Sequence, residues 1–230
     1  MLELQARLGA QTAPSPLPGR AKPVARRRIP QNWWSAKRAI DLALGAVGVV
    51  VSAPIVALAA VAVVCVSPGP PFFAQERVGL NGRRFRMYKL RTMVDGAHLR
   101  HEDLRPYSEV SGPVFKMRND PRLHLFGRVL RRTSIDELPN LINVLRGEMS
   151  LVGPRPPLPS EVPFYDEYSR RRLSVKPGIT CLWQIGGRSN VSFDEWMRLD
   201  NEYIDGWSPL GDLAIIARTL PAVIRGDGAH

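Results

Sequence analysis

Two adjacent carboxylates, Asp136 and Glu137, stand at the predicted start of a helix and follow three closely spaced arginines, Arg128, Arg131 and Arg132. The arginines and the helix dipole would together keep a carboxylate ionised and attract phosphate. An ionised aspartate beside phosphate can act as a nucleophile, and an acidic pair can hold Mg²⁺. Taken alone, the pair also fits a capping role, because acidic residues and the spacing of Ser134 and Glu137 are common at helix starts.

Further candidates for phosphate binding lie in loops and in one extended segment. Arg155 lies between prolines that restrict its backbone and would pre-order the guanidinium, although a rigid turn gives the same pattern. Arg188 follows two glycines whose N–H groups can face an anion, and here a surface loop is the alternative. Lys89 and Arg91 belong to the basic segment 85–93, which we expect to be extended.

Residues 42–66 carry no charged side chain and would just cross a bilayer core of about 30 Å as a helix. Both flanks are basic, however, and basic flanks favour the cytoplasmic side. A helix that enters the membrane, breaks and leaves by the same face would place both basic flanks on the cytoplasmic side. Pro54 can supply the break, and Ser52 can bond a carbonyl that the break frees. A kinked single span is the alternative.

Composition narrows the class of protein. The chain has 230 residues, with 32 basic against 21 acidic side chains and a net charge of +11, and most of the basic residues are arginine. Arginine suits phosphate in lipids, nucleotides or nucleic acid. The apolar run argues against a soluble nucleic-acid-binding module. The two cysteines form no metal or disulfide motif, which indicates a reducing compartment.

Two helices are expected in the middle of the chain. Asp120 as N-cap and Pro121 at the first helical position predict a helix that ends near Arg132. Residues 134–146 then carry apolar side chains at helical spacing, and this second helix should end before Gly147.

A third and a fourth helix complete the chain. Ser192 and Glu195 form a capping box that opens the third helix, which should end before Gly206, and residues 210–224 form an apolar fourth helix. We therefore expect an α+β fold that is mostly helical with little strand. Its expected parts are a disordered basic tail (1–30), a membrane segment (31–70) and a cytoplasmic catalytic domain (71–230).

Four stretches of the chain carry a resemblance to a known family. They are KRAIDLALG (37–45), PFFAQERVGLNGRRFRMYKLRTM (71–93), NDPRLHLFGRVLRRTSIDELPNLINVLRGEMSLVGPRP (119–156) and KPGITCLWQIGGRS (176–189). Together they resemble the bacterial sugar transferase family, the small membrane-bound phosphoglycosyl transferases that start glycan assembly on polyprenyl phosphate. The resemblance covers residues from about 35 to about 225.

The resemblance implies a re-entrant helix and a catalytic dyad at Asp136 and Glu137. It implies transfer of a hexose-1-phosphate from a UDP-sugar to polyprenyl (undecaprenyl) phosphate, with Mg²⁺. In the family mechanism Asp136 would attack the sugar-bearing phosphorus and expel UMP. The lipid phosphate would then displace the sugar phosphate from Asp136. Glu137 would hold Mg²⁺ or act as a base, and the sequence does not separate these roles. The implied location is the cytoplasmic face of a bacterial inner membrane.

The chain departs from the family pattern at Cys181, where glycine is usual, and at Gly186, where a small polar residue is common. A Mg²⁺-dependent phosphohydrolase is the rival enzyme, and an arginine-rich membrane or nucleic-acid binding protein is the non-enzymatic rival. We expect a phospholipid membrane as a partner and no nucleic acid. The sugar, the glycan pathway and a homodimer are left open.

Overall fold

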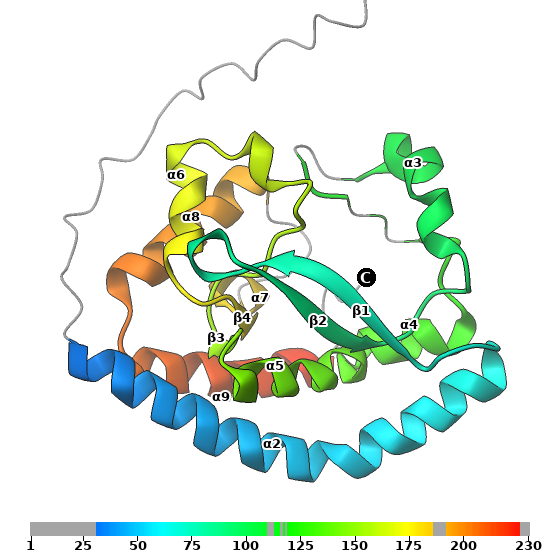
Figure 1. Cartoon of the computed structure of the whole chain (residues 1–230), viewed down its shortest axis with the longest axis horizontal. Coiled ribbons are helices and arrows are strands. Elements are labelled where there is room, and N and C mark those ends of the chain that lie inside the picture. Colours follow the sequence, from blue (N-terminus) through cyan, green and yellow to red (C-terminus); the bar gives the residue numbers. More distant parts are fainter. Residues whose placement is uncertain (1–30, 110–112, 116, 118, 186–191, 226–230) are drawn as a thin grey trace, which may run out of the picture.

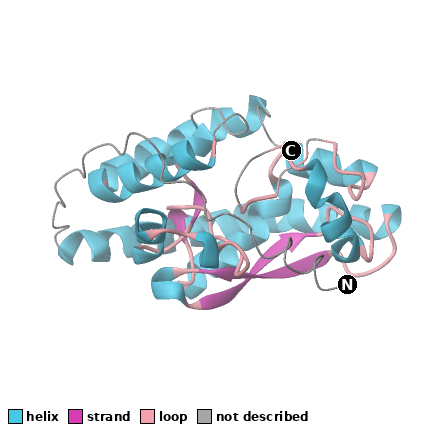
Figure 2. Ribbon diagram, turned by 90° about the horizontal axis from the view of Figure 1, so that it is seen from above, coloured by secondary structure: helices cyan, strands magenta, loops and turns pink. Residues whose placement is uncertain are grey.

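The computed structural model describes residues 31–109, 113–115, 117, 119–185 and 192–225. These residues are mostly helical with little strand, as expected (Figure 2). The expected tail at 1–30 lies outside the described residues. The helices and strands are α2 (Gln31–Val66), β1 (Phe72–Val78), β2 (Arg84–Leu90), α3 (His101–Leu104), α4 (Leu125–Arg132), α5 (Leu141–Arg146), β3 (Ser150–Val152), α6 (Glu167–Arg170), β4 (Gly178–Thr180), α7 (Leu182–Ile185), α8 (Phe193–Gly206) and α9 (Pro209–Arg225). Short 3₁₀ helices join them: η1 (Leu80–Gly82), η2 (Ala97–Arg100), η3 (Arg105–Tyr107), η4 (Ile135–Asn140), η5 (Val162–Phe164) and η6 (Arg171–Ser174).

The long apolar helix α2 bows beneath the rest of the molecule, and its two ends rise on the same side (Figure 1). The helix continues through Pro54, so the expected break is instead a bend. Proline removes a single backbone hydrogen bond, and a gradual curve gives its ring room without ending the helix. The Ser52 hydroxyl donates to the Val49 carbonyl at 3.4 Å. It does not bond the Val50 carbonyl, which the missing N–H of Pro54 leaves free.

A twisted hairpin lies above α2 (Figure 1). Strands β1 and β2 pair antiparallel from Phe72 with Leu90 to Val78 with Arg84, so the expected extended segment 85–93 is confirmed as far as Leu90. The second sheet is a short parallel pair of β3 and β4. Gly178 is required there, because a Cβ atom on it would lie 2.1 Å from the Gly153 nitrogen.

The first two expected helices differ from the prediction at their starts. The first begins later, as α4, and His124 caps it by accepting the Gly127 N–H at 3.0 Å. Asp120 accepts the Arg122 N–H at 3.0 Å and forms a buried ion pair with the Arg122 side chain at 2.6 Å, but no helix starts there. The second begins as η4 and continues as α5, which ends before Gly147 as expected. The N-cap Ser134 accepts no capping hydrogen bond, so the expected capping box does not form.

The last two helices agree with the prediction. Helix α8 begins where expected, with the Ser192 side chain accepting the Glu195 N–H at 3.2 Å, and it ends at Gly206. Helix α9 covers the expected apolar segment.

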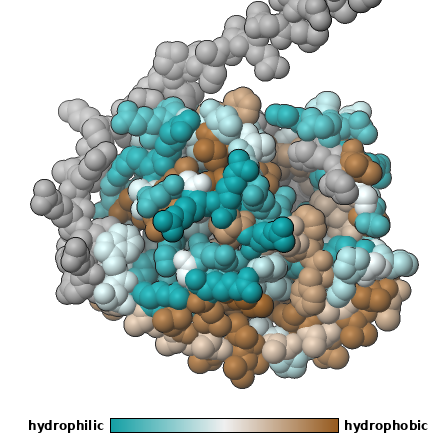
Figure 3. Space-filling model, in the orientation of Figure 1, coloured by the Kyte–Doolittle hydropathy of each residue, from teal (hydrophilic) through white to brown (hydrophobic). Residues whose placement is uncertain are grey.

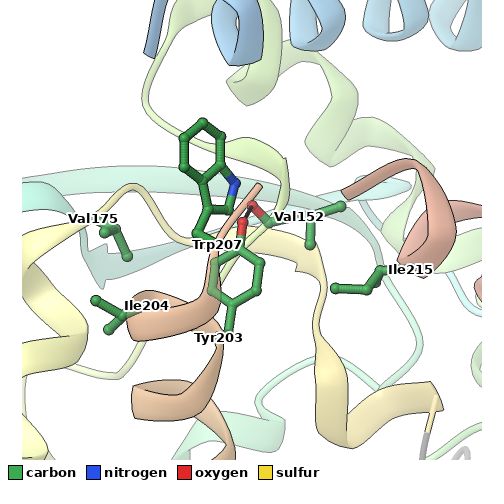
Figure 4. Close-up of a cluster of buried hydrophobic side chains, with 6 residues drawn as sticks. All are labelled: Val152, Val175, Tyr203, Ile204, Trp207 and Ile215. Atoms are coloured by element: carbon green, nitrogen blue, oxygen red, sulfur yellow. Dashed lines mark hydrogen bonds between the residues drawn. The ribbon is translucent and has the colours of Figure 1, made fainter. Parts of the chain in front are cut away.

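Two buried clusters attach these elements to one another. One joins β3, α8 and α9 (Figure 4); its members are Val152, Val175, Tyr203, Ile204, Trp207 and Ile215. The other joins the second half of α2 to β2 and α4; its members are Ala59, Val63, Leu90 and Leu130. Ile135 of η4 packs against this second cluster, which holds the element that carries the carboxylate pair close to the long apolar helix.

Candidate active site

The carboxylate pair lies in the first turn of η4, beside the end of β2. The chain leaves α4 through Ser134, whose φ of 56° is left-handed and separates α4 from η4. Ile135 then packs against the cluster that contains Leu90 and Leu130. The start of η4 is therefore held next to the end of β2, and the structure brings Asp136 and Glu137 close to Lys89.

Asp136 is buried, with 6% of its surface exposed. Burial raises the pKa of its carboxyl to about 6, while Lys89 lowers it, Glu137 raises it and Arg131 lowers it, in that order. The sequence predicted that basic neighbours would keep this carboxylate ionised. These basic neighbours lower the pKa of Asp136, but desolvation by burial raises it by more than they lower it.

Glu137 forms an ion pair with Lys89, with 2.6 Å between Nζ and Oε1. The two side chains are 22% and 30% exposed, so the pair is reachable from solvent. Lys89 thus lies beside both acids: it bonds one and lowers the pKa of the other. A cation in this position can also meet an incoming phosphate.

The three upstream arginines do not share one environment. Arg131 points back toward the dyad region, donating from Nε to the Thr92 hydroxyl at 3.2 Å. Burial lowers the pKa of Arg131, and the charge of Asp136 opposes that shift. Arg128 and Arg132 are exposed on the surface of α4. Arg131 is therefore the member of this group that the structure places beside Asp136.

Arg155 lies in the loop after β3. Its guanidinium lies over the Trp196 ring, 5.5 Å from the centroid. Arg172 donates a hydrogen bond to the backbone carbonyl of Arg155 at 2.8 Å, which fixes the backbone of that residue. Arg172 is itself buried and paired with Asp200 at 2.8 Å. The expected pre-ordering of Arg155 thus comes from Trp196 and Arg172 as well as from the flanking prolines.

Arg77, on β1, is a site residue that the sequence did not suggest. It is 4% exposed and donates to the Pro156 carbonyl at 3.0 Å, which fastens the Arg155 loop to the hairpin. Burial and then Arg155 lower the pKa of Arg77 to about 9, while Glu161 and Glu137 oppose them. Arg77 therefore connects the Arg155 loop with the dyad. In the sequence, Arg77 is only a charged residue in a short strand, and no motif marks it as part of a site.

Two of the sequence candidates do not join this group. Arg91 is buried at the end of α2, and its terminal nitrogens donate to the carbonyls of Ser67, Pro68 and Gly69. It therefore holds the segment that directly follows the long apolar helix. Arg188 lies outside the described residues.

The dyad is also the place to test for a metal ion. Within the described part of the chain, no group of three or more His, Cys, Asp and Glu side chains could share a metal. Mg²⁺ commonly binds one or two carboxylates and takes its other ligands from substrate phosphates and water. Asp136 and Glu137 fit that pattern in donor type and number, with one Glu137 oxygen bonded to Lys89.

Comparison of the sequence with known proteins shows to which family the chain belongs. The family model described as bacterial sugar transferase matches residues 32–226. The galactosyl transferase CpsE of Streptococcus agalactiae is 47% identical over 195 residues, 84% of this chain and 43% of that protein. The exopolysaccharide production protein ExoY of Rhizobium meliloti is 37% identical over 202 residues, 85% of this chain and 88% of that protein.

A third relative is the UDP-glucose:undecaprenyl-phosphate glucose-1-phosphate transferase of Caulobacter vibrioides. It is 41% identical over 205 residues, 84% of this chain and 72% of that protein. The chain thus spans less than half of CpsE and most of ExoY. The family model covers most of the chain, including the dyad and the Arg155 loop. The chain therefore belongs to a family of enzymes, the bacterial sugar transferases.

Proposed function

We propose that this protein transfers a hexose-1-phosphate from a UDP-sugar to undecaprenyl phosphate or a related polyprenyl phosphate. The observation that carries the proposal is the buried carboxylate of Asp136, held between the Lys89–Glu137 ion pair and Arg131. One relative is named for this reaction with UDP-glucose, and one from Salmonella typhimurium is named an undecaprenyl-phosphate galactose phosphotransferase. Glucose and galactose are therefore the first sugars to test.

Asp136 is the proposed nucleophile. With a pKa of about 6, roughly nine in ten of these carboxyls are ionised at neutral pH. A carboxylate oxygen attacks the sugar-bearing phosphorus, and the bond from that phosphorus to the bridging oxygen breaks, so that UMP leaves with its electron pair. An oxygen of the lipid phosphate then attacks the same phosphorus and regenerates the free carboxylate.

The cations around Asp136 supply charge for this reaction. Lys89 and Arg131 are the cations whose charges act on Asp136, so they lie where negative charge would accumulate on the transferred phosphoryl group. Fixed cations in a partly dry site stabilise such charge without reorganising. Mg²⁺ held by the dyad would neutralise further phosphate charge. Glu137 would either hold this ion or accept a proton from the lipid phosphate.

We further propose that α2 is re-entrant and lies in the inner membrane, with the rest of the chain on the cytoplasmic face. One helix in the described residues, Trp34–Val66, is long and apolar enough to cross a membrane, and little of it is buried. Both of its ends are attached to the same domain. Lys37 pairs with Asp212 near the start, and Arg91 binds the carbonyls after the end. A straight span would separate those ends by a bilayer core of about 30 Å.

The surface around α2 supports the same orientation. Figure 3 shows a hydrophobic band along the edge where α2 runs, below a mainly hydrophilic face. Exposed apolar side chains also occur on other helices: Leu125 and Val129 on α4, Ile142 on α5, and Leu210 and Leu213 on α9. A helix inserted from one face would place such side chains at the lipid interface.

The test is a radiolabelled assay of a panel of UDP-sugars with and without undecaprenyl phosphate. The proposal requires labelled lipid and UMP in equal amounts. Free sugar phosphate formed equally well without lipid would instead support the rival phosphohydrolase. Intact-mass analysis of protein given UDP-sugar alone tests the covalent step, because it should find one sugar-phosphate adduct, lost in Asp136→Asn.

A further inference from the structure

A second basic site lies far from the dyad, against the first turns of α2. It is a cavity of about 280 Å³, lined by Trp34, Lys37, Arg38, Asp41, Leu80, Ser174, Val175 and Lys176. Leu80 belongs to the hairpin turn, whereas Lys89 lies near the other end of β2. The five residue steps from Arg84 to Lys89 alone extend about 17 Å along that strand. This cavity is therefore separate from the proposed transfer site.

Three cations converge on the cavity, and two of them are already committed to the protein. Lys37 is paired with Asp212 at 2.5 Å. Arg38 donates to the carbonyls of Val144 and Leu145 at 2.7 and 2.8 Å, which caps α5. Both contacts hold the positive charges in place without needing a ligand.

The third cation, Lys176, is different. Within the described residues no carboxylate lies within ion-pair distance of its ammonium group. The nearest acid in the cavity wall is Asp41, whose Oδ1 accepts the Ser150 hydroxyl and the Leu151 N–H, each at 2.9 Å. Burial, and then the Arg38 charge, lower the pKa of Lys176, while Asp41 opposes them. A half-buried ammonium beside another cation is stabilised by an added anion.

The position of the cavity indicates the source of that anion. Arg38 lies about one helical turn before Leu42, where the exposed apolar surface of α2 begins. Trp34, half exposed at the cavity wall, stacks on Trp207 with 5.1 Å between the rings. Tryptophan and basic side chains at the edge of an apolar surface are typical of the lipid headgroup region. Leu80 and Val175 give the cavity an apolar wall beside its cations.

We propose that this cavity binds the phosphate of an anionic phospholipid headgroup, with Lys176 as its principal charged contact. The inference rests on the proposed membrane position of α2 but not on the transfer reaction. Phosphatidylglycerol carries one net negative charge and matches a site with one uncommitted cation. The bound headgroup would attach the start of α2 to the membrane surface on the side of the molecule away from the dyad.

The test uses the full-length protein in neutral detergent. Retention and titration of short-chain phosphatidylglycerol are measured by native mass spectrometry, with phosphatidylcholine and inorganic phosphate as separate arms. We expect one phosphatidylglycerol per chain, weaker phosphatidylcholine binding, and about tenfold loss of affinity in Lys176→Gln, as for a lost charged hydrogen bond. Lys176→Arg should restore most of the affinity.

Arg105→Gln is the matched control, because it removes one charge from an exposed side chain outside the cavity. An equal loss in this control, or equal binding of phosphatidylcholine, would overturn recognition of the headgroup. Inorganic phosphate that displaces the lipid at equal concentration would assign the cavity to a soluble anion instead. Transferase activity is measured on the same samples. Inactive protein that still binds phosphatidylglycerol would refute the proposed reaction and leave the lipid site standing.

Discussion

Two lysine–carboxylate ion pairs of nearly equal length lie in opposite surroundings. Lys37 and Asp212 are 2.5 Å apart and only 8% and 5% exposed, whereas Lys89 and Glu137 are 2.6 Å apart and 22% and 30% exposed. The first pair is surrounded by further bonds: Asp212 also accepts from the Tyr203 hydroxyl and the Trp207 indole N–H. The second pair borders a buried acid whose pKa it changes.

The difference shows that distance alone does not separate a structural ion pair from a functional one. A buried pair with saturated hydrogen bonds stabilises one arrangement of the chain, and removing one partner leaves an uncompensated charge. A solvent-reachable pair contributes little to stability. Its charges remain able to act on a neighbouring group or a substrate.

Asp136→Asn should have the largest effect on activity. The amide keeps the shape of the side chain but is a very poor nucleophile, so transfer should fall by about four orders of magnitude or more, at about 1.4 kcal/mol per tenfold. The rate of lipid-linked sugar formation measures this. A loss below about tenfold would exclude Asp136 as the nucleophile.

The same substitution should not destabilise the fold. The folded pKa of Asp136 is raised from 3.8 to about 6, so the folded state holds the proton more tightly. The free energy of unfolding of the native protein should therefore fall as pH rises from about 4 to about 6. Asp136→Asn removes that slope, and at pH 7 it should be more stable by at most about 3 kcal/mol. Chemical unfolding at several pH values checks the sign.

Asp212→Asn should have the largest effect on stability. It leaves the Lys37 ammonium buried without its counter-charge, which should cost about 3–5 kcal/mol. Unfolding in detergent measures the loss, and the double variant Lys37→Met, Asp212→Leu should recover much of it. A loss below about 1 kcal/mol would mean that this pair is no more structural than an exposed one.

Lys89→Gln should give the opposite result. Stability should change by less than about 1 kcal/mol, because the pair is partly solvated. Activity should fall by about 10- to 100-fold, as for a lost acid–base or charge contact. Because Lys89 lowers the pKa of Asp136, its removal should move the acid limb of the rate profile from near pH 6 to higher pH.

Arg84→Gln is the control for Lys89→Gln, since it breaks an exposed pair with Glu76 on the same hairpin. It should change neither stability nor the pH profile. An acid limb that stays in place in Lys89→Gln would refute the electrostatic role of Lys89.

The smallest effect is expected from Pro54→Ala, because the two ends of α2 are held by Lys37 and Arg91 rather than by the bend. Cysteines introduced one at a time at Ser35 and Arg83, in a Cys65→Ser background that keeps only the buried Cys181, should both resist a membrane-impermeant maleimide in intact cells, with or without Pro54. Labelling at one of the two positions in the otherwise native chain would refute the re-entrant arrangement. Labelling only after Pro54→Ala would instead make the proline, not the end contacts, the cause of the bend.

Local patterns predicted well wherever neighbouring residues decide the structure. The capping pair of Ser192 and Glu195 gave the start of α8, because both groups lie within one turn. The same reasoning was wrong at Asp120, where Arg122 binds the carboxylate that was expected to cap a helix. Arg91 was expected at phosphate, but its donors face the end of α2, a contact 22 to 24 residues away in sequence.

Residue types and short spacings were enough to indicate the apolar helix, the adjacent carboxylates at a helix start and the preference for phosphate that many arginines give. Which cations lie beside the acids, and how strongly burial acts on Asp136, followed from the packing of the folded chain. Lys89 and Glu137 are 48 positions apart, and Lys37 and Asp212 are 175 apart. Burial and charge–charge energies depend on distance in space, and packing alone brings such residues together.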